Sequence, residues 1–469
     1  MDIRNLYSLF WECSRVATDS RAIEGGEMFF GLKGENFDGN EYALKALEKG
    51  ARYAVVDEGT AATSSGDDRV VPVPDTLQAL QALARHHREN TLVDGHPITV
   101  IGLTGTNGKT TTKELITRVL SMKYKVTSTQ GNLNNDIGVP LSVLSIGDDS
   151  EIAVIEMGAS HPDDIEKLVK VCEPDYGLIT NVGRAHLLGF GSFEGVKRAK
   201  GKLYDYLAAH GGKAFVNVDD PDLTAMAAER WPVGPVIPYG IDHWGAIVLP
   251  SSAEHPYLRM AIPPVPEPLV PVPELVEGPE VRLAHQPDQG ETLLAVETHL
   301  AGAYNATNVA AAIAVGLRFG VTLEEAIEAV ESYIPKNNRS QMEKTERNIL
   351  IKDAYNANPT SMTAALANLG MVEAERKVAL LGDMRELGYE SLSEHVKILD
   401  KVLSMRLDLV CLVGEEFGKA LNGSIPESVK WFPTSDDLAS WLGDNPVSGA
   451  TVLVKGSRGI QMERTLPEL

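Results

Sequence analysis

The sequence predicts an α/β protein of three domains, and three observations support this prediction. From about residue 97 onwards, near-continuous apolar segments alternate with segments of helical period, which is typical of a parallel sheet covered by helices on both faces. A glycine-rich turn joins one of these strands to a helix, and the same alternation resumes after Pro335. The chain has 469 residues, more than one typical core holds. We expect a small N-terminal α/β domain (1–96), a central parallel-sheet domain carrying a phosphate loop (97–335) and a C-terminal doubly wound, Rossmann-like domain (336–469).

The composition argues against several classes of protein. Apolar residues make up 43% and charged residues 23%, as in soluble globular proteins. The sequence has no long apolar run and a polar N-terminus, so we expect neither a membrane span nor a secretion signal. The formal charge of −22 argues against a nucleic-acid or membrane surface, and Cys13, Cys172 and Cys411 are too scattered for a disulfide framework or a metal site. We therefore expect a cytoplasmic protein, taken as a monomer, in which local basic groups bind any anionic ligand.

The first 96 residues contain two polar clusters between their short strands and helices. The expected elements are strands at 26–32 and 53–57 and helices at 41–49 and 76–89. The clusters are Thr18–Arg21 and Asn36–Asn40. Turn chemistry alone explains both, because Asp, Asn, Ser and Gly favour such geometry. Hydroxyls, an arginine and an aromatic ring in loops also suit a nucleotide base and diphosphate, so both interpretations stay open.

The central domain begins with a phosphate loop. A strand ending at Thr104 is followed by Gly105-Thr-Asn-Gly-Lys-Thr-Thr111, and helical period continues from Lys109 to Met122. Backbone N–H groups then converge on an anion at a helix N-terminus. Lys109 would contact the β- and γ-phosphates of a nucleotide, with the Thr110 or Thr111 hydroxyl on Mg²⁺. The usual first glycine of this motif is replaced by Leu103, so the loop is an unusually short form.

Polar residues follow the other strands of this domain. Further strands are expected at 125–128, 151–156 and 176–181, with helices at 162–172 and 193–210. Because ligands bind beyond the carboxyl ends of parallel strands, Gly105, Glu156 and Asn181 mark the expected site, with His186 just after. Glu156, one strand removed from the loop, would form a magnesium pair with Thr110. An ordinary polar loop histidine remains the alternative for His186.

A proline-rich segment interrupts the domain at about 250–290 and cannot supply a central strand. We interpret it as an extended surface excursion and keep a ligand for proline-binding modules as the alternative. Helices at 305–319 and 323–333 follow, the second capped by Thr322.

The third domain repeats the strand–helix alternation after a hinge at 335–338. We expect strands at 348–353, 377–381, 409–413 and 451–454, and helices at 360–370 and 391–406. The strands end in Asp353, Asp383 and the segment Lys455–Arg458, which we expect to face the first site across a cleft.

Taken together, these motifs resemble the Mur ligase family over nearly the whole chain. The segments that carry the resemblance are 18–21, 36–39, 105–111, 131–140, 156–158, 186–191, 197–201, 304–308, 353–359, 382–388 and 455–458. Tyr355-Asn-Ala-Asn-Pro359 and Gly382-Asp-Met-Arg-Glu-Leu-Gly388 favour the branch that adds D-alanyl-D-alanine, and the Asp-Asn-Pro-Arg mark of the diaminopimelate-adding branch is absent.

The resemblance implies an ATP-dependent amide-bond ligase of peptidoglycan precursor synthesis. ATP would phosphorylate the terminal carboxylate of a UDP-N-acetylmuramoyl-tripeptide, and the amino group of D-alanyl-D-alanine would attack the acyl phosphate, releasing ADP and phosphate. A carboxylate is a poor acyl donor until phosphate replaces oxide as the leaving group, so the site must neutralise charge.

The resemblance also assigns residue roles. Catalytic roles fall to Lys109, Glu156, His186 and Lys200. Two Mg²⁺ ions would be held by Thr110, Glu156, His186 and a carbamylated Lys200, since a plain ammonium cannot ligate a cation. ATP would contact Gly105, Thr106, Asn107, Gly108, Lys109, Thr110, Thr111, Asn305, Asn308, Arg339 and Asp353. Substrate contacts are implied for Ser20, Arg21, Asn36, Phe37, Asp38, Asn134, Asn135, Asp136, Tyr355, Asn356, Asn358, Asp383, Lys455, Ser457 and Arg458.

Without the resemblance, plainer interpretations hold for several of these residues. Lys200 belongs to a basic helix face, Asn305 is a helix cap, and Asp353 is a strand-end acid. A sister ligase adding the third amino acid, or folylpolyglutamate synthase, is the alternative of the same class. A non-catalytic module in which ATP only switches conformation is the alternative of another class. The third residue of the tripeptide, diaminopimelate or lysine, is left open.

Overall fold

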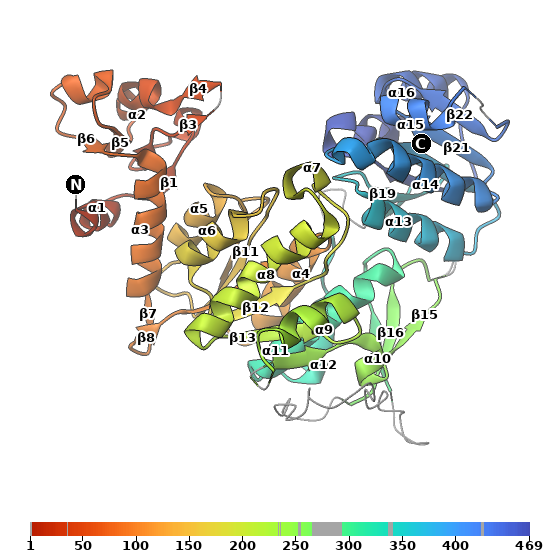
Figure 1. Cartoon of the computed structure of the whole chain (residues 1–469), viewed down its shortest axis with the longest axis horizontal. Coiled ribbons are helices and arrows are strands. Elements are labelled where there is room, and N and C mark those ends of the chain that lie inside the picture. The colour runs from red at the N-terminus through yellow and green to blue at the C-terminus, as the bar shows by residue number, and fades with distance from the viewer. Residues whose placement is uncertain are drawn as a thin grey trace.

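The computed structural model describes residues 2–34, 36–232, 234, 236–251, 255–264, 293–335, 341–423 and 426–469. Figure 1 shows three units in chain order, with the N-terminal and C-terminal units on opposite sides of the central one. Four sheets of three or more strands build them: one of four strands, two of six and one of three. The predicted three-part α/β architecture is therefore confirmed, while the exact boundaries at 96 and 335 remain predictions.

The N-terminal unit is a small parallel sheet that packs on the central unit through one long helix. Its sheet order is β1 (Val16–Ala17), β2 (Met28–Phe30), β5 (Tyr53–Asp57) and β6 (Val70–Val73). Its helices are α1 (Ile3–Phe10), α2 (Ala43–Glu48) and α3 (Thr76–Asn90). Two short hairpins complete it, β3 (Lys33–Gly34) with β4 (Phe37–Asp38) and β7 (Leu92–Val93) with β8 (His96–Pro97). Asp75 caps α3 by accepting a hydrogen bond from the Gln78 N–H. Leu80 and Leu83 of α3 share one buried cluster with Val139 and Leu168 of the central unit, so the hydrophobic core is continuous across residue 96.

The central unit is a fully parallel sheet of six strands. In spatial order these are β10 (Val126–Ser128), β11 (Ile152–Glu156), β9 (Thr99–Thr104), β12 (Tyr176–Ile179), β13 (Lys213–Asn217) and β14 (Val236–Tyr239). Its helices are α4 (Lys109–Leu120), α5 (Gly138–Leu144), α6 (Asp164–Cys172), α7 (Leu187–Phe190), α8 (Phe193–His210), α9 (Pro221–Ala228), α11 (Ala306–Arg318) and α12 (Leu323–Glu331). The prediction for Glu156 needs one correction: β11 pairs directly with β9, so Glu156 ends the strand beside the phosphate loop.

Two strands of this sheet were not predicted. The buried residues Ala214, Phe215 and Val216 of β13 form an apolar run too short to be distinguished from a loop. Strand β14 contains Pro238, which it tolerates because β14 lies at the edge of the sheet.

A small antiparallel sheet, also not predicted, follows the central one. It consists of β15 (Ile247–Leu249), β16 (Arg259–Ile262) and β17 (Leu294–Glu297), after the short helix α10 (Ile241–Trp244). Most of the proline-rich segment predicted at about 250–290 lies outside the described residues.

The C-terminal unit is a second six-stranded sheet. Its order is β18 (Gln341–Lys344), β19 (Ile349–Asp353), β23 (Thr451–Lys455), β20 (Lys377–Gly382), β21 (Leu409–Val413) and β22 (Val429–Phe432), and only β18 is antiparallel. Its helices are α13 (Pro359–Met371), α14 (Ser391–Ser404), α15 (Glu415–Leu421) and α16 (Ser435–Asp444). The doubly wound prediction holds, although β18, β22, α15 and α16 were not anticipated.

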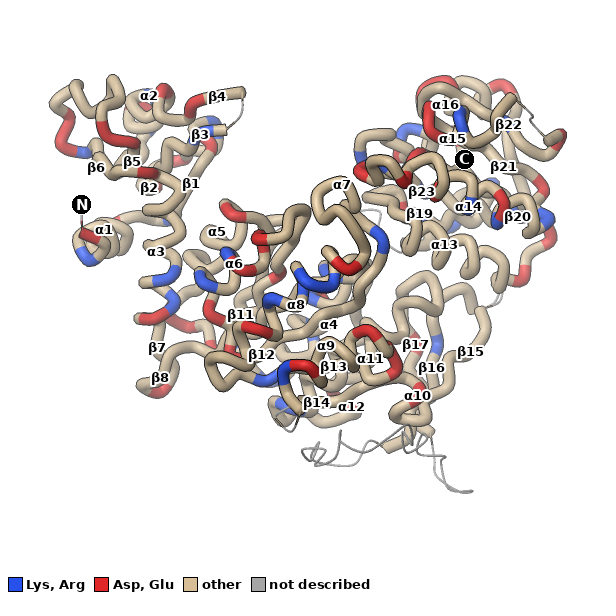
Figure 2. Tube along the Cα trace, in the orientation of Figure 1, with Lys and Arg blue, Asp and Glu red and all other residues tan. Residues whose placement is uncertain are grey.

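Charges of both signs are distributed along all three units (Figure 2). A cluster of basic residues lies on α8, in the middle of the molecule: Lys197, Arg198, Lys200 and Lys202. Among the described helices, none combines the length and the apolar character that crossing a membrane requires.

Candidate active site

The phosphate loop adopts a backbone that requires glycine at two positions. Gly105 has φ +151°, and a Cβ built on it would lie 1.9 Å from the Thr180 hydroxyl oxygen. Gly108 has φ +77° and occupies the N-cap position of α4. Because both residues adopt conformations that L side chains rarely take, the chain can turn tightly and aim its N–H groups at an anion.

Two lysines share one carbonyl of this loop. The Nζ of Lys109 donates to the carbonyls of Gly105 and Thr106 over 2.8 and 3.1 Å, and the Nζ of Lys200 donates to Gly105 over 3.0 Å. Lys200 is fully buried, and burial lowers the pKa of its amine well below the usual range, with the charge of Lys109 acting in the same direction. The structure therefore brings Lys109 and Lys200 together, as expected.

Glu156 is the acidic centre of the site. The Thr110 hydroxyl donates to its Oε2 over 3.0 Å, and the side-chain amide of Asn134 donates to its Oε1 over 2.8 Å. The Glu156 side chain is buried at the end of β11. Carboxylate and hydroxyl oxygens are ligands that Mg²⁺ prefers, so the chemistry of this pair fits the metal.

His186 lies at the boundary with the C-terminal unit. Its backbone is left-handed, with φ +51°, and the Glu386 carboxylate of the C-terminal unit lies against its Nδ1. Burial lowers the pKa of His186, opposed by the charge of Glu386. No three His, Cys, Asp or Glu side chains of the described residues cluster as a closed metal site. A magnesium ion here would thus depend on nucleotide phosphates and water as further ligands.

A cavity of about 890 Å³ is lined by Lys109, Glu156 and His186 and by residues of both larger units, whereas Lys200 lies outside its lining. The predicted residues that line it are Thr106, Asn107, Gly108, Lys109, Thr110, Thr111, Asn134, Asn135, Asp136, Glu156, His186, Asn305, Asn308, Asp353, Tyr355, Asn356, Asn358 and Lys455. Sequence elements almost 350 residues apart thereby converge on one volume. Asn305 stands at the N-cap of α11, but its amide donates to the Ala301 carbonyl instead of capping the helix.

The C-terminal unit touches the phosphate loop directly. The side-chain amide of Asn358 donates to Oδ1 of Asn107 over 2.8 Å, and Asn358 also caps α13. Lys455 is buried against Asp353 and donates to the Asn356 carbonyl over 3.2 Å. A second cavity, of about 270 Å³, continues from here and contains Ser457 and Arg458.

Asp383 does not lie where the sequence analysis predicts, at the cleft that would bind substrate. It lines neither cavity: its buried carboxylate accepts hydrogen bonds from the Glu416 and Phe417 N–H groups at the start of α15. The position of Asp383 after a parallel strand correctly predicts the edge of the sheet at which its backbone lies. Its side chain nevertheless turns into the C-terminal unit, because the N-terminus of α15 offers free N–H groups there.

The predicted residues of the N-terminal unit also line neither cavity. Arg21 is exposed and pairs with Asp19, whereas Asp38 accepts hydrogen bonds from Asn40. The remaining three are Ser20, Asn36 and Phe37, of which Phe37 is 61% exposed. Arg339, predicted to contact ATP, lies outside the described residues.

The sequence analysis does not select several residues that line these cavities. Tyr304 and Thr360 line the larger one, and Glu386 lines the smaller. Glu386 belongs to the segment 382–388 that carries the family resemblance, but the substrate contact predicted in that segment is its first acid, Asp383. Its left-handed backbone, with φ +65°, is a structural signal that no sequence pattern reveals.

Three family profiles match the chain. They are described as the Mur ligase family catalytic domain (residues 12–88), the Mur ligase middle domain (103–316) and the Mur ligase glutamate ligase domain (338–458).

Curated relatives match over almost the full length. UDP-N-acetylmuramoyl-tripeptide–D-alanyl-D-alanine ligase from Bacillus subtilis is 32% identical and covers 97% of this chain and 92% of its own length. The protein of the same name from Escherichia coli is 31% identical, with coverages of 97% and 93%.

Solved structures of similar proteins superpose on nearly the whole chain. MurF from Acinetobacter baumannii superposes with a TM-score of 0.82 at 28% identity, covering 100% of this chain and 98% of its own. MurF ligase from Thermotoga maritima in complex with ADP gives 0.79 at 26% identity, with coverages of 97% and 96%.

Proposed function

The chain belongs to the Mur ligase family, and from this premise we propose that it adds D-alanyl-D-alanine to a UDP-N-acetylmuramoyl-tripeptide at the expense of ATP. The observation that carries the proposal is the likeness to ligases of that name over 97% of the chain at 31–32% identity. We place the reaction in the cytoplasm, where ATP and UDP-linked precursors are made.

The phosphate loop supplies the groups for phosphoryl transfer. The N–H groups at the start of α4 would bind the β-phosphate, and Lys109 would exchange its loop carbonyls for the β- and γ-phosphates. Glu156 and Thr110 would hold Mg²⁺, which neutralises phosphate charge when bound. The tripeptide carboxylate then attacks the γ-phosphorus, ADP leaves, and an acyl phosphate remains.

Lys200 fits a second role only after modification. As an ammonium it repels a cation, but its lowered pKa favours the neutral amine, which is the form that adds CO₂ to give a carbamate. We propose that carbamylated Lys200 and His186 together hold a second Mg²⁺. A ¹³C resonance in protein equilibrated with ¹³C-bicarbonate, absent from Lys200→Met, would establish the carbamate; identical spectra would refute it.

The residues of the N-terminal unit keep their predicted role as a UDP-binding surface. Phe37 and Arg21 are exposed and therefore accessible to a base and a diphosphate. The test is the Kd of the UDP-precursor for Arg21→Ala and Phe37→Ala, expected to rise, with unchanged affinity for ADP as the control.

One assay tests the overall proposal. The chain is incubated with ATP, Mg²⁺, D-alanyl-D-alanine and either the diaminopimelate or the lysine tripeptide, and phosphate release and the mass of the UDP-linked product are measured. A pentapeptide product from either precursor is expected. Phosphate release with a single amino acid or a folate acceptor, and none with the dipeptide, would favour one of the alternative ligases; ATP binding without any product would favour the switch module.

A further inference from the structure

The second cavity adjoins the larger one at His186. Its lining includes the charged residues Arg385, Glu386 and Arg458. Four residues line both cavities: His186, Tyr355, Asn356 and Asn358. The two volumes therefore share a wall, and a ligand in the smaller one lies next to the place where an acyl phosphate would form.

The cavity is lined by charged groups of both signs, which a zwitterionic ligand requires. Arg458 lies over the Tyr355 ring, 5.4 Å from its centroid, and Arg385 lies against Gly459. Among the described residues, no carboxylate pairs with either guanidinium, so both are available for an anionic group. Glu386 is the acid of the cavity and lies against His186, which also lines the larger cavity.

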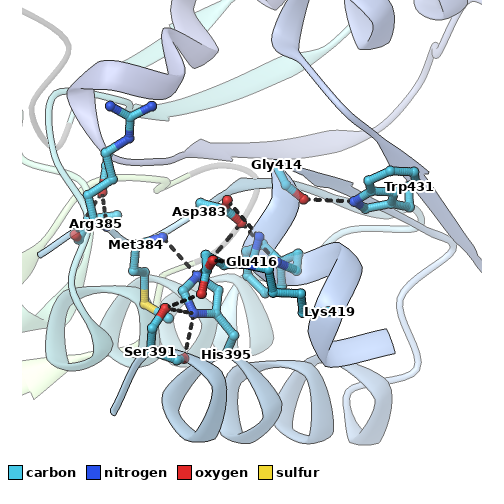
Figure 3. Close-up of polar contacts among 12 residues, drawn as sticks. Asp383, Met384, Arg385, Ser391, His395, Gly414, Glu416, Lys419 and Trp431 are labelled. Atoms are coloured by element: carbon cyan, nitrogen blue, oxygen red, sulfur yellow. Dashed lines mark hydrogen bonds and ion pairs between the residues drawn. The ribbon is translucent and has the colours of Figure 1, made fainter. Parts of the chain in front are cut away.

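The turn that carries Glu386 is held by a buried polar network (Figure 3). The Met384 N–H donates to Nε2 of His395 over 3.0 Å, and Nδ1 of His395 donates to the Ser391 carbonyl over 2.7 Å. The Arg385 N–H donates to the Ser457 hydroxyl over 2.9 Å. His395 is completely buried, so the turn has little freedom to move and Glu386 is fixed at the interface between the units.

We propose that Glu386 binds the ammonium group of the acceptor dipeptide in the second cavity and so places its nitrogen at the acyl phosphate. The carboxylate of the dipeptide would then point to Arg458 and Arg385. This assignment rests on the proposed function, because it places the acceptor of that reaction.

The acceptor nitrogen gives up two protons during the reaction. The dipeptide arrives as an ammonium held by Glu386 and loses one proton to water, which leaves the neutral amine as the nucleophile. Its lone pair attacks the acyl-phosphate carbon, so the C–N bond forms and the nitrogen becomes positively charged. This nitrogen is far more acidic than a free ammonium, so its second proton passes to water as the C–O bond to phosphate breaks.

The test compares two nucleophiles with the Glu386→Gln variant. D-Alanyl-D-alanine requires an anion to hold its ammonium, whereas hydroxylamine is neutral near pH 7 and traps the acyl phosphate as a hydroxamate. We expect kcat/KM for the dipeptide to fall about 100-fold or more, because the ion pair with its ammonium is lost, and hydroxamate formation from the tripeptide and ATP to stay at the wild-type rate. Glu386 is 61% exposed on its side chain, so the substitution leaves the core intact.

Glu390→Gln is the matched control. Glu390 pairs with Arg184 over 3.0 Å in the same interface but lines neither cavity, so this variant should ligate the dipeptide normally. An equal loss of both products in Glu386→Gln would show that Glu386 acts only through His186 and would overturn the proposal, as would full activity with the dipeptide. A wild-type chain that forms the hydroxamate but no dipeptide product would instead refute the proposed function.

Discussion

Asn358 of the C-terminal unit donates its side-chain amide to Oδ1 of Asn107 in the phosphate loop over 2.8 Å. This bond joins the N-terminus of α13 to the loop that would bind ATP. A C-terminal unit resting on the loop is the arrangement expected if domain closure assembles the site.

We predict that Asn107→Ala weakens this closed arrangement. The interdomain bond is lost, so X-ray scattering should give a larger radius of gyration, and the KM for ATP should rise. Asn358→Ala removes the same bond and also the cap of α13, which costs about 1 kcal/mol of unfolding free energy. The two variants should therefore expand alike, with a lower Tm for Asn358→Ala. Scattering curves identical to wild type, with and without nucleotide, would contradict the role of this contact in closure.

Gly105→Ala should abolish nucleotide binding. Its Cβ would lie 1.9 Å from the Thr180 hydroxyl at φ +151°, so the loop must distort, and the backbone strain alone costs about 1–3 kcal/mol. The measurement is the Kd of a fluorescent ADP analogue together with the Tm. Gly211→Ala is the control: φ is +73°, but nothing lies within 4 Å of the new Cβ, so it should cost stability and leave nucleotide affinity unchanged. Wild-type affinity in Gly105→Ala would mean that the loop tolerates a side chain.

The phosphate loop and the acid beside it could be predicted from the sequence, whereas Lys200 could not. The loop, its helix and the acid at the next strand end are local in sequence or follow from the parallel-sheet rule, and the structure brings Thr110 and Glu156 within hydrogen-bond distance as expected. Lys200 is different, because its bond to Gly105 spans 95 residues and only the family resemblance selected it.

The direction of side chains was not predictable at the strand ends of the C-terminal unit. Asp353 and Asp383 both end or follow parallel strands there, yet Asp353 faces the cavity and Asp383 faces α15. The difference depends on where neighbouring N–H groups and lysines lie in space. For the same reason Glu386, whose contact with His186 spans two units, was not selected from the sequence.

His87 should make the stability of the protein fall in mild acid. It is buried in α3, where its Nδ1 lies 3.2 Å from the Tyr7 hydroxyl and its Nε2 2.8 Å from the Ile146 carbonyl of the central unit. Burial lowers the pKa of His87 below 6.5, so the unfolded chain binds a proton that the folded chain does not. The contribution of neutral His87 to the unfolding free energy is therefore complete above about pH 6.5, and it decreases as the pH falls toward the pKa of His87 in the folded protein.

Denaturant unfolding between pH 7.5 and 5 measures this dependence. We expect the unfolding free energy of His87→Gln to decrease less over this interval than that of wild type, while His86→Gln, at a neighbouring position that is not buried, should follow wild type. Parallel curves for all three proteins would exclude His87 as the cause.

Glu156→Gln should separate metal binding from nucleotide binding. The amide oxygen still accepts a hydrogen bond, but the negative charge is lost, so the Mg²⁺ concentration for half-maximal ligation should rise about 10-fold or more. The Kd for ADP without metal should stay unchanged or decrease, because Lys109 and the α4 N–H groups remain and a carboxylate near the phosphates is gone. Asn134→Ala removes only the neutral partner of Glu156 and should shift the Mg²⁺ requirement less than Glu156→Gln does. If Glu156→Gln titrated with Mg²⁺ like wild type, the ion would have to be held elsewhere in the cavity.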